Sequence, residues 1–225
     1  EVLSGYLCRW LNMPGTDYVN TIVYGKDCSV CQIKTSPSVE LIPARDVLTR
    51  TGSTMSAEGG YYSRFFECDP LQFAKMQVFD YITLNSDRNR DNFALRRERG
   101  RITGLYPVFD HDSCFKAKSI QGHYFVTGTT FSEVPKILAM YCPEETFARI
   151  MEDTAHFSKE LQKPENRELC MALKGHEIYD GICEHTEQIF SSMQKLLKDP
   201  DRQKQKLVAW LKDRMTKCKN TSQQL

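Results

Sequence analysis

The 225-residue chain carries 30 Lys and Arg residues against 29 Asp and Glu residues, which leaves a net charge of only +1. Such a balance gives no bulk attraction to nucleic acid or to acidic membranes, so any charged partner must be met locally. No apolar run approaches the roughly 18 to 20 residues that span a bilayer. The nine cysteines are scattered rather than set in a dense, even framework. We therefore expect a soluble, cytoplasmic protein.

The first third of the chain reads as mixed α/β. Apolar residues recur at helical spacing in "EVLSGYLCRWL", which opens the chain without a methionine and predicts that a leading portion of a longer polypeptide precedes it. The stretches "YVNTIVYG" and "CSVCQIK" then alternate like a pair of β-strands. In "ELIPARDVLTRTG", Pro43 is expected at a helix start and Gly52 beyond the helix end.

Further helices flank one strand hairpin. Asp69 is expected to cap the start of a helix, and Pro70 to occupy its first position. One face of this helix is apolar and is made by Leu71, Ala74, Val78 and Ile82. After the loop "SDRNRDNF" the period becomes two, in "NFALR" and "ITGLYPVFD" around a turn at "RERGR", which indicates a hairpin. From about Ser132 the chain again reads as helical. Two apolar stripes stand out there, over residues 179–196 and 207–215.

The loop Ser86 to Phe93 admits three interpretations: a calcium loop, a phosphoryl-transfer loop or a polar turn. The EF-hand positions one, three, five and twelve are filled by Asp87, Asn89, Asp91 and Glu98. An EF-hand also needs a second helix and a glycine at position six, whereas here a hairpin follows and Asn92 stands sixth. Nearby arginines would also crowd a divalent cation, so calcium is disfavoured. A turn capped by Asp87 and Asn92 stays open.

The spacing of three residues matches the demands of phosphoryl transfer. That reaction needs a carboxylate to orient the attacking hydroxyl, together with an amide oxygen and a second carboxylate to hold Mg²⁺ on the phosphates. Asp87 and Asn92 stand five apart, as in the kinase pattern D-x-x-x-x-N. Asp110 ends the strand "YPVF", and a hairpin would return this strand end toward the loop. We therefore expect Asp110 to face Asn92 across a metal.

These motifs resemble a known family. The stretches "FDYITLNSDRNRDNFAL" and "LYPVFDHDSCF" are similar to the catalytic core of the HipA-type serine/threonine kinases, whose loop reads N-x-D-R-H-x-x-N-F before P-x-F-D. The stretch "CSVCQIKTSPSVELIPARDVL" resembles their hinge strand and the helix after it. The stretch "EVLSGYLCRWL" resembles the helix whose glutamate pairs with the ATP-orienting lysine. The resemblance covers roughly Glu1 to Phe115.

The resemblance implies roles for particular residues. Asp87 would be the catalytic aspartate that accepts the proton of the substrate hydroxyl, and Asn92 and Asp110 would be Mg²⁺ ligands. ATP would be the cosubstrate. Glu1 would be the helix glutamate. The hinge that meets adenine would fall near Cys31, at Gln32 and Ile33.

The chain departs from the family pattern in three places. Asn89 stands where the family usually has histidine, and His111-Asp112 stands where it often has Asn-Gly. Neither a glycine-rich phosphate loop nor the lysine strand occurs in the sequence. The chain therefore looks like the larger lobe of a kinase with most of its small lobe removed, and we expect little activity from residues 1–225 alone because the missing parts position the phosphates.

Two other clusters have simpler interpretations. Cys28 and Cys31 have a spacing that can serve zinc, but no second pair matches it, so free thiols on a hinge strand are favoured. The arginines of "RRERGR" could contact nucleic-acid phosphates. Their place at a hairpin tip, interrupted by Glu98 and Gly100, favours a solvated turn.

We therefore predict an α+β, mainly helical, kinase-like larger lobe. Residues 1–42 would be a remnant of the small lobe and hinge, and residues 43–225 the helical lobe that carries the catalytic loop. The predicted reaction is Mg²⁺-dependent transfer of the ATP γ-phosphate to a protein Ser or Thr, with an antitoxin-like or regulatory protein as a further partner. The alternatives are a pseudokinase or regulatory binding module without turnover, or a lipid or small-molecule kinase with a D-R-x-x-x-N loop.

Overall fold

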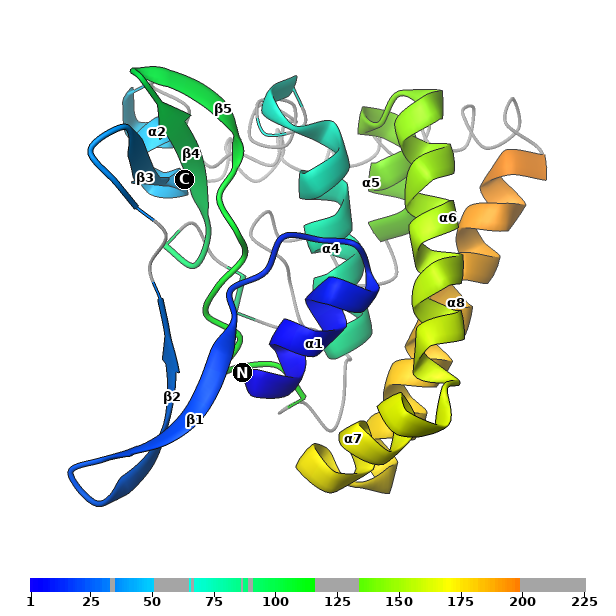
Figure 1. Ribbon diagram of the computed structural model, residues 1–225. Coiled ribbons are helices and arrows are strands. Elements are labelled where there is room, and N and C mark those ends of the chain that lie inside the picture. Colours follow the sequence, from blue (N-terminus) through cyan, green and yellow to red (C-terminus); the bar gives the residue numbers. More distant parts are fainter. Residues whose placement is uncertain are drawn as a thin grey trace, which may run out of the picture.

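The computed structural model describes residues 1–32, 35–50, 65, 67–85, 87–88, 91–115 and 134–198. Helices form one side of the molecule, and two small antiparallel sheets lie on the other (Figure 1). The elements in chain order are α1 (Val2–Trp10), β1 (Tyr18–Val23), β2 (Lys26–Cys31), β3 (Val39–Pro43), α2 (Ala44–Arg50), α4 (Pro70–Thr83), β4 (Ala94–Glu98), β5 (Arg101–Leu105), α5 (Val134–Tyr141), α6 (Glu144–Leu161), α7 (Pro164–Lys174) and α8 (His176–Lys198).

Helix α4 lies at the centre of the helical core. It begins as predicted: the Asp69 carboxylate accepts a hydrogen bond from the Gln72 N–H at 3.2 Å, and Pro70 occupies the first turn, where no N–H is needed. Helices α1, α5, α6 and α8 pack around it. Its apolar side chains, including Phe73, Phe79 and Ile82, are almost completely buried. Burial on several sides fixes the position of the loop that leaves its C-terminal end.

A buried ion pair joins three of these helices. Lys75 of α4 lies 2.8 Å from the carboxylate of Asp153 of α6, and both side chains are only 3% exposed. Lys75 also donates to the main-chain carbonyl of Asn12, just beyond α1, and Asn12 donates its amide to Asp153. Because each charge has its partner, this polar cluster is tolerated inside an apolar core.

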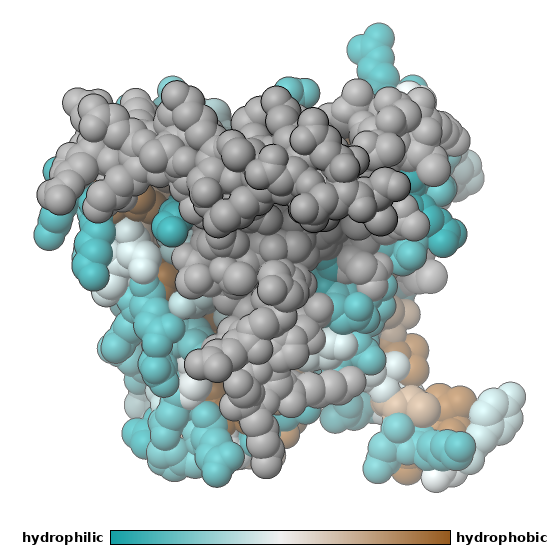
Figure 2. All heavy atoms as spheres, turned by 180° about the vertical axis from the view of Figure 1, so that it is seen from behind, coloured by the Kyte–Doolittle hydropathy of each residue, from teal (hydrophilic) through white to brown (hydrophobic). Residues whose placement is uncertain are grey.

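Strands β1 and β2 form the predicted hairpin, which projects away from the body (Figure 1). Tyr24 and Gly25 turn the chain with φ values of 50° and 74°, which suits the twist of a two-residue hairpin. Apolar side chains on this projection stay in contact with solvent, as the view from behind shows at the lower right (Figure 2). The exposed ones are Val19, Ile22, Val23, Tyr24 and Val30.

The second sheet has the order β3-β4-β5. Strands β4 and β5 are the hairpin predicted after the loop, and they turn at Arg99 and Gly100. Strand β3 was not predicted. The helix expected from Pro43 is α2, which begins one residue later, at Ala44, because Pro43 ends β3 opposite Ala94. Proline has no N–H to donate, so it fits the end of a strand as well as the start of a helix.

The predicted run of helices toward the end of the chain is confirmed by α5 to α8. The apolar stripe over residues 179–196 is the inner face of α8, whereas the stripe over residues 207–215 lies outside the described residues. In the described part of the chain, every helix is too short or too polar to cross a bilayer.

Candidate active site

The end of helix α4 sets the course of the loop that follows. Leu84 takes up a left-handed conformation with φ 53°, which turns the chain out of the helix. The side chain of Asn85 then bonds in two directions: its amide donates to the Asp80 carboxylate at 3.0 Å, and its oxygen accepts the N–H of Asp87 at 3.2 Å. Asp87 is therefore held at a fixed place just beyond the helix, with its side chain exposed.

Arg88 points inward from this loop and is the largest fully buried side chain of the described structure. Its guanidinium pairs with Asp80 of α4 at 3.0 Å, and neither side chain is exposed. Burial raises the pKa of Asp80, although Arg88 and Asn85 act in the opposite direction. Arg88 is thus buried in the core and paired with Asp80, although its positive charge still acts on the pKa of Asp110.

The same guanidinium joins two segments of the proposed site. Its Nη1 donates to the main-chain carbonyl of Asn92 at 2.5 Å and to that of Phe109 at 2.7 Å. One nitrogen therefore holds both the loop that carries Asn92 and the segment that carries Asp110. The sequence predicted that these segments meet, and the structure brings them together through Arg88.

Asn92 and Asp87 are in direct contact. The amide of Asn92 donates to the main-chain carbonyl of Asp87 at 2.7 Å and to its carboxylate at 3.1 Å. Both bonds use the nitrogen of the amide, so the oxygen of Asn92 is not needed for them. Such an oxygen is a suitable ligand for a hard cation.

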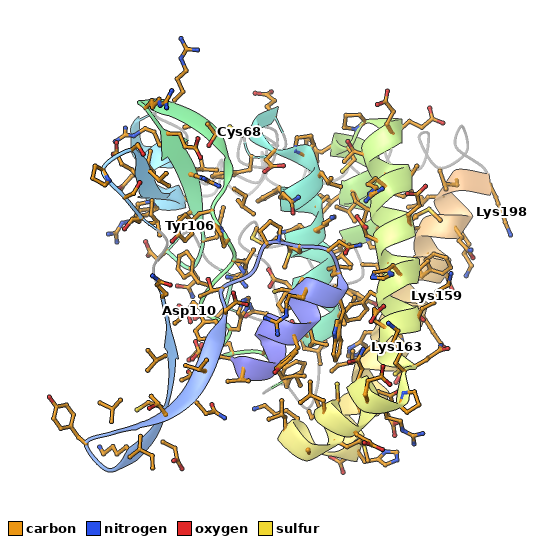
Figure 3. All side chains as sticks on the ribbon, viewed as in Figure 1. Cys68, Tyr106, Asp110, Lys159, Lys163 and Lys198 are labelled. Carbon is orange, nitrogen blue, oxygen red and sulfur yellow. The ribbon has the colours of Figure 1, made fainter. Side chains whose placement is uncertain are left out.

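Asp110 lies between the base of the β1–β2 hairpin and helix α1 (Figure 3). Its backbone is left-handed, with φ 57°. This conformation is uncommon for a residue with a side chain, although aspartate tolerates it better than most. The Asp110 N–H donates to the Tyr18 hydroxyl at 3.0 Å. The conformation of Asp110 is therefore held by groups from outside its own segment.

Acidic groups gather around Asp110. Its pKa is raised, first by partial burial and then by Asp112, with further contributions from Asp87 and Glu1, while Arg88 acts in the opposite direction. Like charges in one place disfavour ionisation of each carboxyl group. A bound cation would relieve this repulsion, so the charge distribution suits a metal site.

His111 packs behind the site and is 1% exposed. Its ring lies 5.1 Å from that of Phe79, and its Nδ1 lies 3.3 Å from Nη2 of Arg88. Burial and the positive charge of Arg88 hold the pKa of His111 well below its ordinary value. The neutral ring can therefore accept a hydrogen bond from Arg88, which gives the guanidinium one more fixed partner.

Two of the residues predicted for the nucleotide, Glu1 and Gln32, are described by the structure. Glu1 precedes α1 and accepts a hydrogen bond from the Ser29 hydroxyl of β2. Gln32 is exposed immediately after β2, and Ile33 lies outside the described residues. A groove of about 660 Å³ opens beside Glu1, lined by Glu1, Val2, Asn20, Thr21, Ile22, Asp27, Cys28, Ser29 and Asp112. Glu1 and Asp112 thus border a space next to Asp110.

Two alternative metal sites do not form in the described residues. Glu98, the proposed twelfth calcium ligand, ends strand β4 and pairs with Arg96 at 2.5 Å, so a strand stands where an EF-hand needs a helix. Cys28 and Cys31 are three apart on strand β2, and residues an odd number apart point to opposite faces. Within the described ranges, no group of three or more His, Cys, Asp and Glu side chains is placed to hold a metal.

Sequence reasoning missed the residues that hold the site together. Arg88 was considered only as one of the arginines that would crowd a cation, and Tyr18 only as part of a predicted strand. Asp80 carried a signal that could have been used, since it falls among the buried positions of an apolar helix, where a carboxylate needs a charged partner. The expected partner is an arginine or lysine nearby, and Arg88 is eight residues away.

Comparisons with known proteins agree with this architecture. No protein-family model matches the chain, and no curated protein does. Among solved structures, the chain is similar to the Helicobacter pylori proinflammatory kinase CtkA, with a TM-score of 0.59 and 11% identity over 88% of this chain and 86% of that one. It also matches HipA from a Shewanella oneidensis complex of HipA, HipB and operator DNA, with a TM-score of 0.44 and 11% identity over 88% of this chain and 55% of that one. The likeness to CtkA establishes the fold: the chain has the α+β, kinase-like fold that the resemblance to HipA-type kinases predicted.

Proposed function

We propose that the chain is the catalytic lobe of a Mg²⁺-dependent kinase that transfers the γ-phosphate of ATP to a protein serine or threonine. The observation that carries this proposal is a pair of hydrogen bonds from one nitrogen: Nη1 of Arg88 donates to the main-chain carbonyls of both Asn92 and Phe109. This contact joins the loop of Asp87 and Asn92 to the segment that carries Asp110, which supports a shared site for these three residues.

The donor set fits magnesium. Mg²⁺ prefers oxygen ligands and in kinase sites takes only one or two of them from the protein, because phosphates and water complete its coordination. The amide oxygen of Asn92 and the carboxylate of Asp110 are such ligands, and the acidic surroundings of Asp110 favour a cation. When bound, Mg²⁺ would neutralise charge on the phosphates.

The chain's own groups have distinct tasks in this proposal. Asp87 accepts the proton of the attacking hydroxyl and orients that hydroxyl toward the phosphate. The Asn92 amide keeps the Asp87 carboxylate in place through its bond of 3.1 Å. Arg88 positions Asn92 and the Asp110 segment without touching the substrate. Gln32 and Ile33 would meet the adenine, and Glu1 would be the helix glutamate that pairs with the ATP-orienting lysine.

Phosphorylation assays with matched variants test the proposal. Because little activity is expected from residues 1–225 alone, the longest form of the protein that its source cells make is purified and incubated with Mg²⁺, labelled ATP and either a serine- and threonine-rich protein mixture or lipid vesicles. We expect Asp87→Asn to lower protein phosphorylation by about 100-fold or more, since removing a general base typically costs that much. Asp110→Asn should also lower it, because the proposed carboxylate ligand of Mg²⁺ is lost. Asp91→Asn is the control, because Asp91 lies in the same loop but pairs with Arg45 at 3.1 Å.

Each other outcome has a defined meaning. Phosphate transfer that survives Asp87→Asn contradicts the assigned role of Asp87. Labelling of lipid instead of protein would indicate the lipid-kinase alternative. Binding of Mg²⁺ and ATP without transfer would indicate a pseudokinase. An antitoxin-like partner stays a prediction, which co-purification from the source cells would test.

A further inference from the structure

The segment before the β1–β2 hairpin runs alongside the segment that ends at Asp110. The Val108 N–H donates to the Pro14 carbonyl at 3.0 Å, and the Thr16 N–H donates to the Val108 carbonyl at 2.9 Å. Gly15 and Val108 form a parallel bridge. The next N–H in this series is that of Asp110, and its acceptor is the side-chain hydroxyl of Tyr18 rather than a main-chain carbonyl.

The peptide group between Phe109 and Asp110 is consequently held at both ends. Arg88 donates to its carbonyl oxygen at 2.7 Å, and Tyr18 accepts from its N–H at 3.0 Å. The two side chains come from segments 70 positions apart in the chain: Arg88 lies in the loop after α4, and Tyr18 is the first residue of β1. Asp110 follows this peptide in a left-handed conformation, φ 57°. Such a conformation persists only where the surroundings fix it.

We propose that Tyr18 is a positioning residue for Asp110, and that its hydroxyl, together with Arg88, fixes the peptide whose orientation aims the Asp110 carboxylate at the metal. This proposal rests on the proposed function, because it assigns Tyr18 a task in the same site. Tyr18 touches neither the metal nor the substrate. It acts through the main chain of Asp110, as partners of metal ligands commonly do.

The position of Tyr18 suits a link between the hairpin and the site. Its side chain is half-buried, and its ring lies edge-on to that of His111 with centroids 6.1 Å apart. The rest of strand β1 is exposed. A phenylalanine at this position would keep the ring against His111 and remove only the oxygen atom that accepts the Asp110 N–H. Tyr18→Phe is therefore a sharp probe of that single bond.

The matched control is Tyr24→Phe, because Tyr24 is fully exposed at the hairpin turn. Three quantities are compared among wild type and the two variants: kcat and KM for ATP across a Mg²⁺ titration, binding of Mn²⁺ with ADP by electron paramagnetic resonance, and amide hydrogen exchange of Asp110 by NMR. Thermal melting checks that the variants are folded.

We expect Tyr18→Phe to raise the Mg²⁺ concentration for half-maximal activity by roughly 10-fold, the lower end of what removal of such a partner typically costs. Mn²⁺ binding should weaken by a similar factor, and the Asp110 amide should exchange faster. High Mg²⁺ should restore most of kcat, which a general loss of stability would not allow. Tyr24→Phe should match the wild type in every quantity.

Equal Mg²⁺ dependence, Mn²⁺ affinity and Asp110 exchange in wild type and Tyr18→Phe would overturn the proposal. Faster exchange with unchanged metal affinity would also overturn it, because the bond would then exist without aiming the carboxylate. If the wild type neither transfers phosphate nor binds Mn²⁺ with ADP, the proposed function fails, and the assignment of Tyr18 to a metal site fails with it for that separate and recognisable reason.

Discussion

Replacement of Arg88 by lysine should weaken the fold and the site together. Lysine keeps the positive charge beside Asp80 but has a single nitrogen in place of the planar fork. It cannot reach Asp80 and also the carbonyls of Asn92 and Phe109, which lie 2.5 and 2.7 Å from Nη1. Each carbonyl then loses a charged donor, worth about 1.5 kcal/mol at the lower end of the usual range because both residues are only half-buried.

The expected loss is therefore about 3 kcal/mol in the free energy of unfolding. For a chain of this size it corresponds to a fall of about 10 °C in the melting temperature. Urea unfolding followed by circular dichroism measures it, and the slope of the transition should stay unchanged if the native and unfolded states keep their compactness. Phosphate transfer should fall as well, because the two segments are no longer held by one nitrogen.

Arg96→Lys provides the control for this measurement. Arg96 pairs with Glu98 on the surface, where its side chain is 45% exposed, so the substitution should change stability by less than about 0.5 kcal/mol. A loss below about 1 kcal/mol for Arg88→Lys would refute the reasoning, since it would mean that the carbonyls find other donors or that the fork contributes little.

Three further predictions concern separate parts of the molecule. Asp110→Asn should raise the melting temperature at pH 7 without Mg²⁺, because the folded-state pKa of Asp110 is raised above 3.8 and its ionised form therefore destabilises the fold. In a series of melting curves at different pH, this gain in melting temperature should vanish as the pH falls below 3.8. Lys75→Met should lower the free energy of unfolding in urea by about 3 kcal/mol, because the buried Asp153 loses its nearest cation and keeps only the Asn12 amide and the more distant Arg149, at 3.4 Å. The Mg²⁺ dependence of the folded protein should stay unchanged. Gly104→Ala should lower the melting temperature, because Gly104 has a φ of 150° and an added Cβ would lie 2.7 Å from the Asp69 carboxylate that caps α4. An unchanged melting temperature would contradict this account.

The sequence was most informative where the structure is local. The cap at Asp69 and Pro70 and the turn at Gly100 depend on residues a few positions apart, and the structure confirms both. The helix at α4 is confirmed as well, but it is buried on several sides rather than along one apolar face. The pattern of Asp87, Asn92 and Asp110 was also visible, because a catalytic loop keeps its spacing. The roles of these three residues stay predictions.

The sequence was least informative where contacts join distant segments. Strand β3 was missed because its only partner within the second sheet is β4, more than 50 residues later, and a strand of five residues has a weak pattern of its own. The role of Tyr18 depends on Asp110, 92 positions away. The burial of Arg88 follows from the helices that surround Asp80. The spacing of neighbouring residues in the sequence does not predict such long-range contacts.

The pairing of residues 14–16 with Val108 has a consequence for the order of folding. Closing a loop of more than 90 residues costs conformational entropy before the contact returns any stabilisation. Helices such as α6, α7 and α8 are joined by short turns and need no such closure. We therefore expect a folding chain to complete its helical core first, and to pair residues 14–16 with the segment that carries Val108 and Asp110 late.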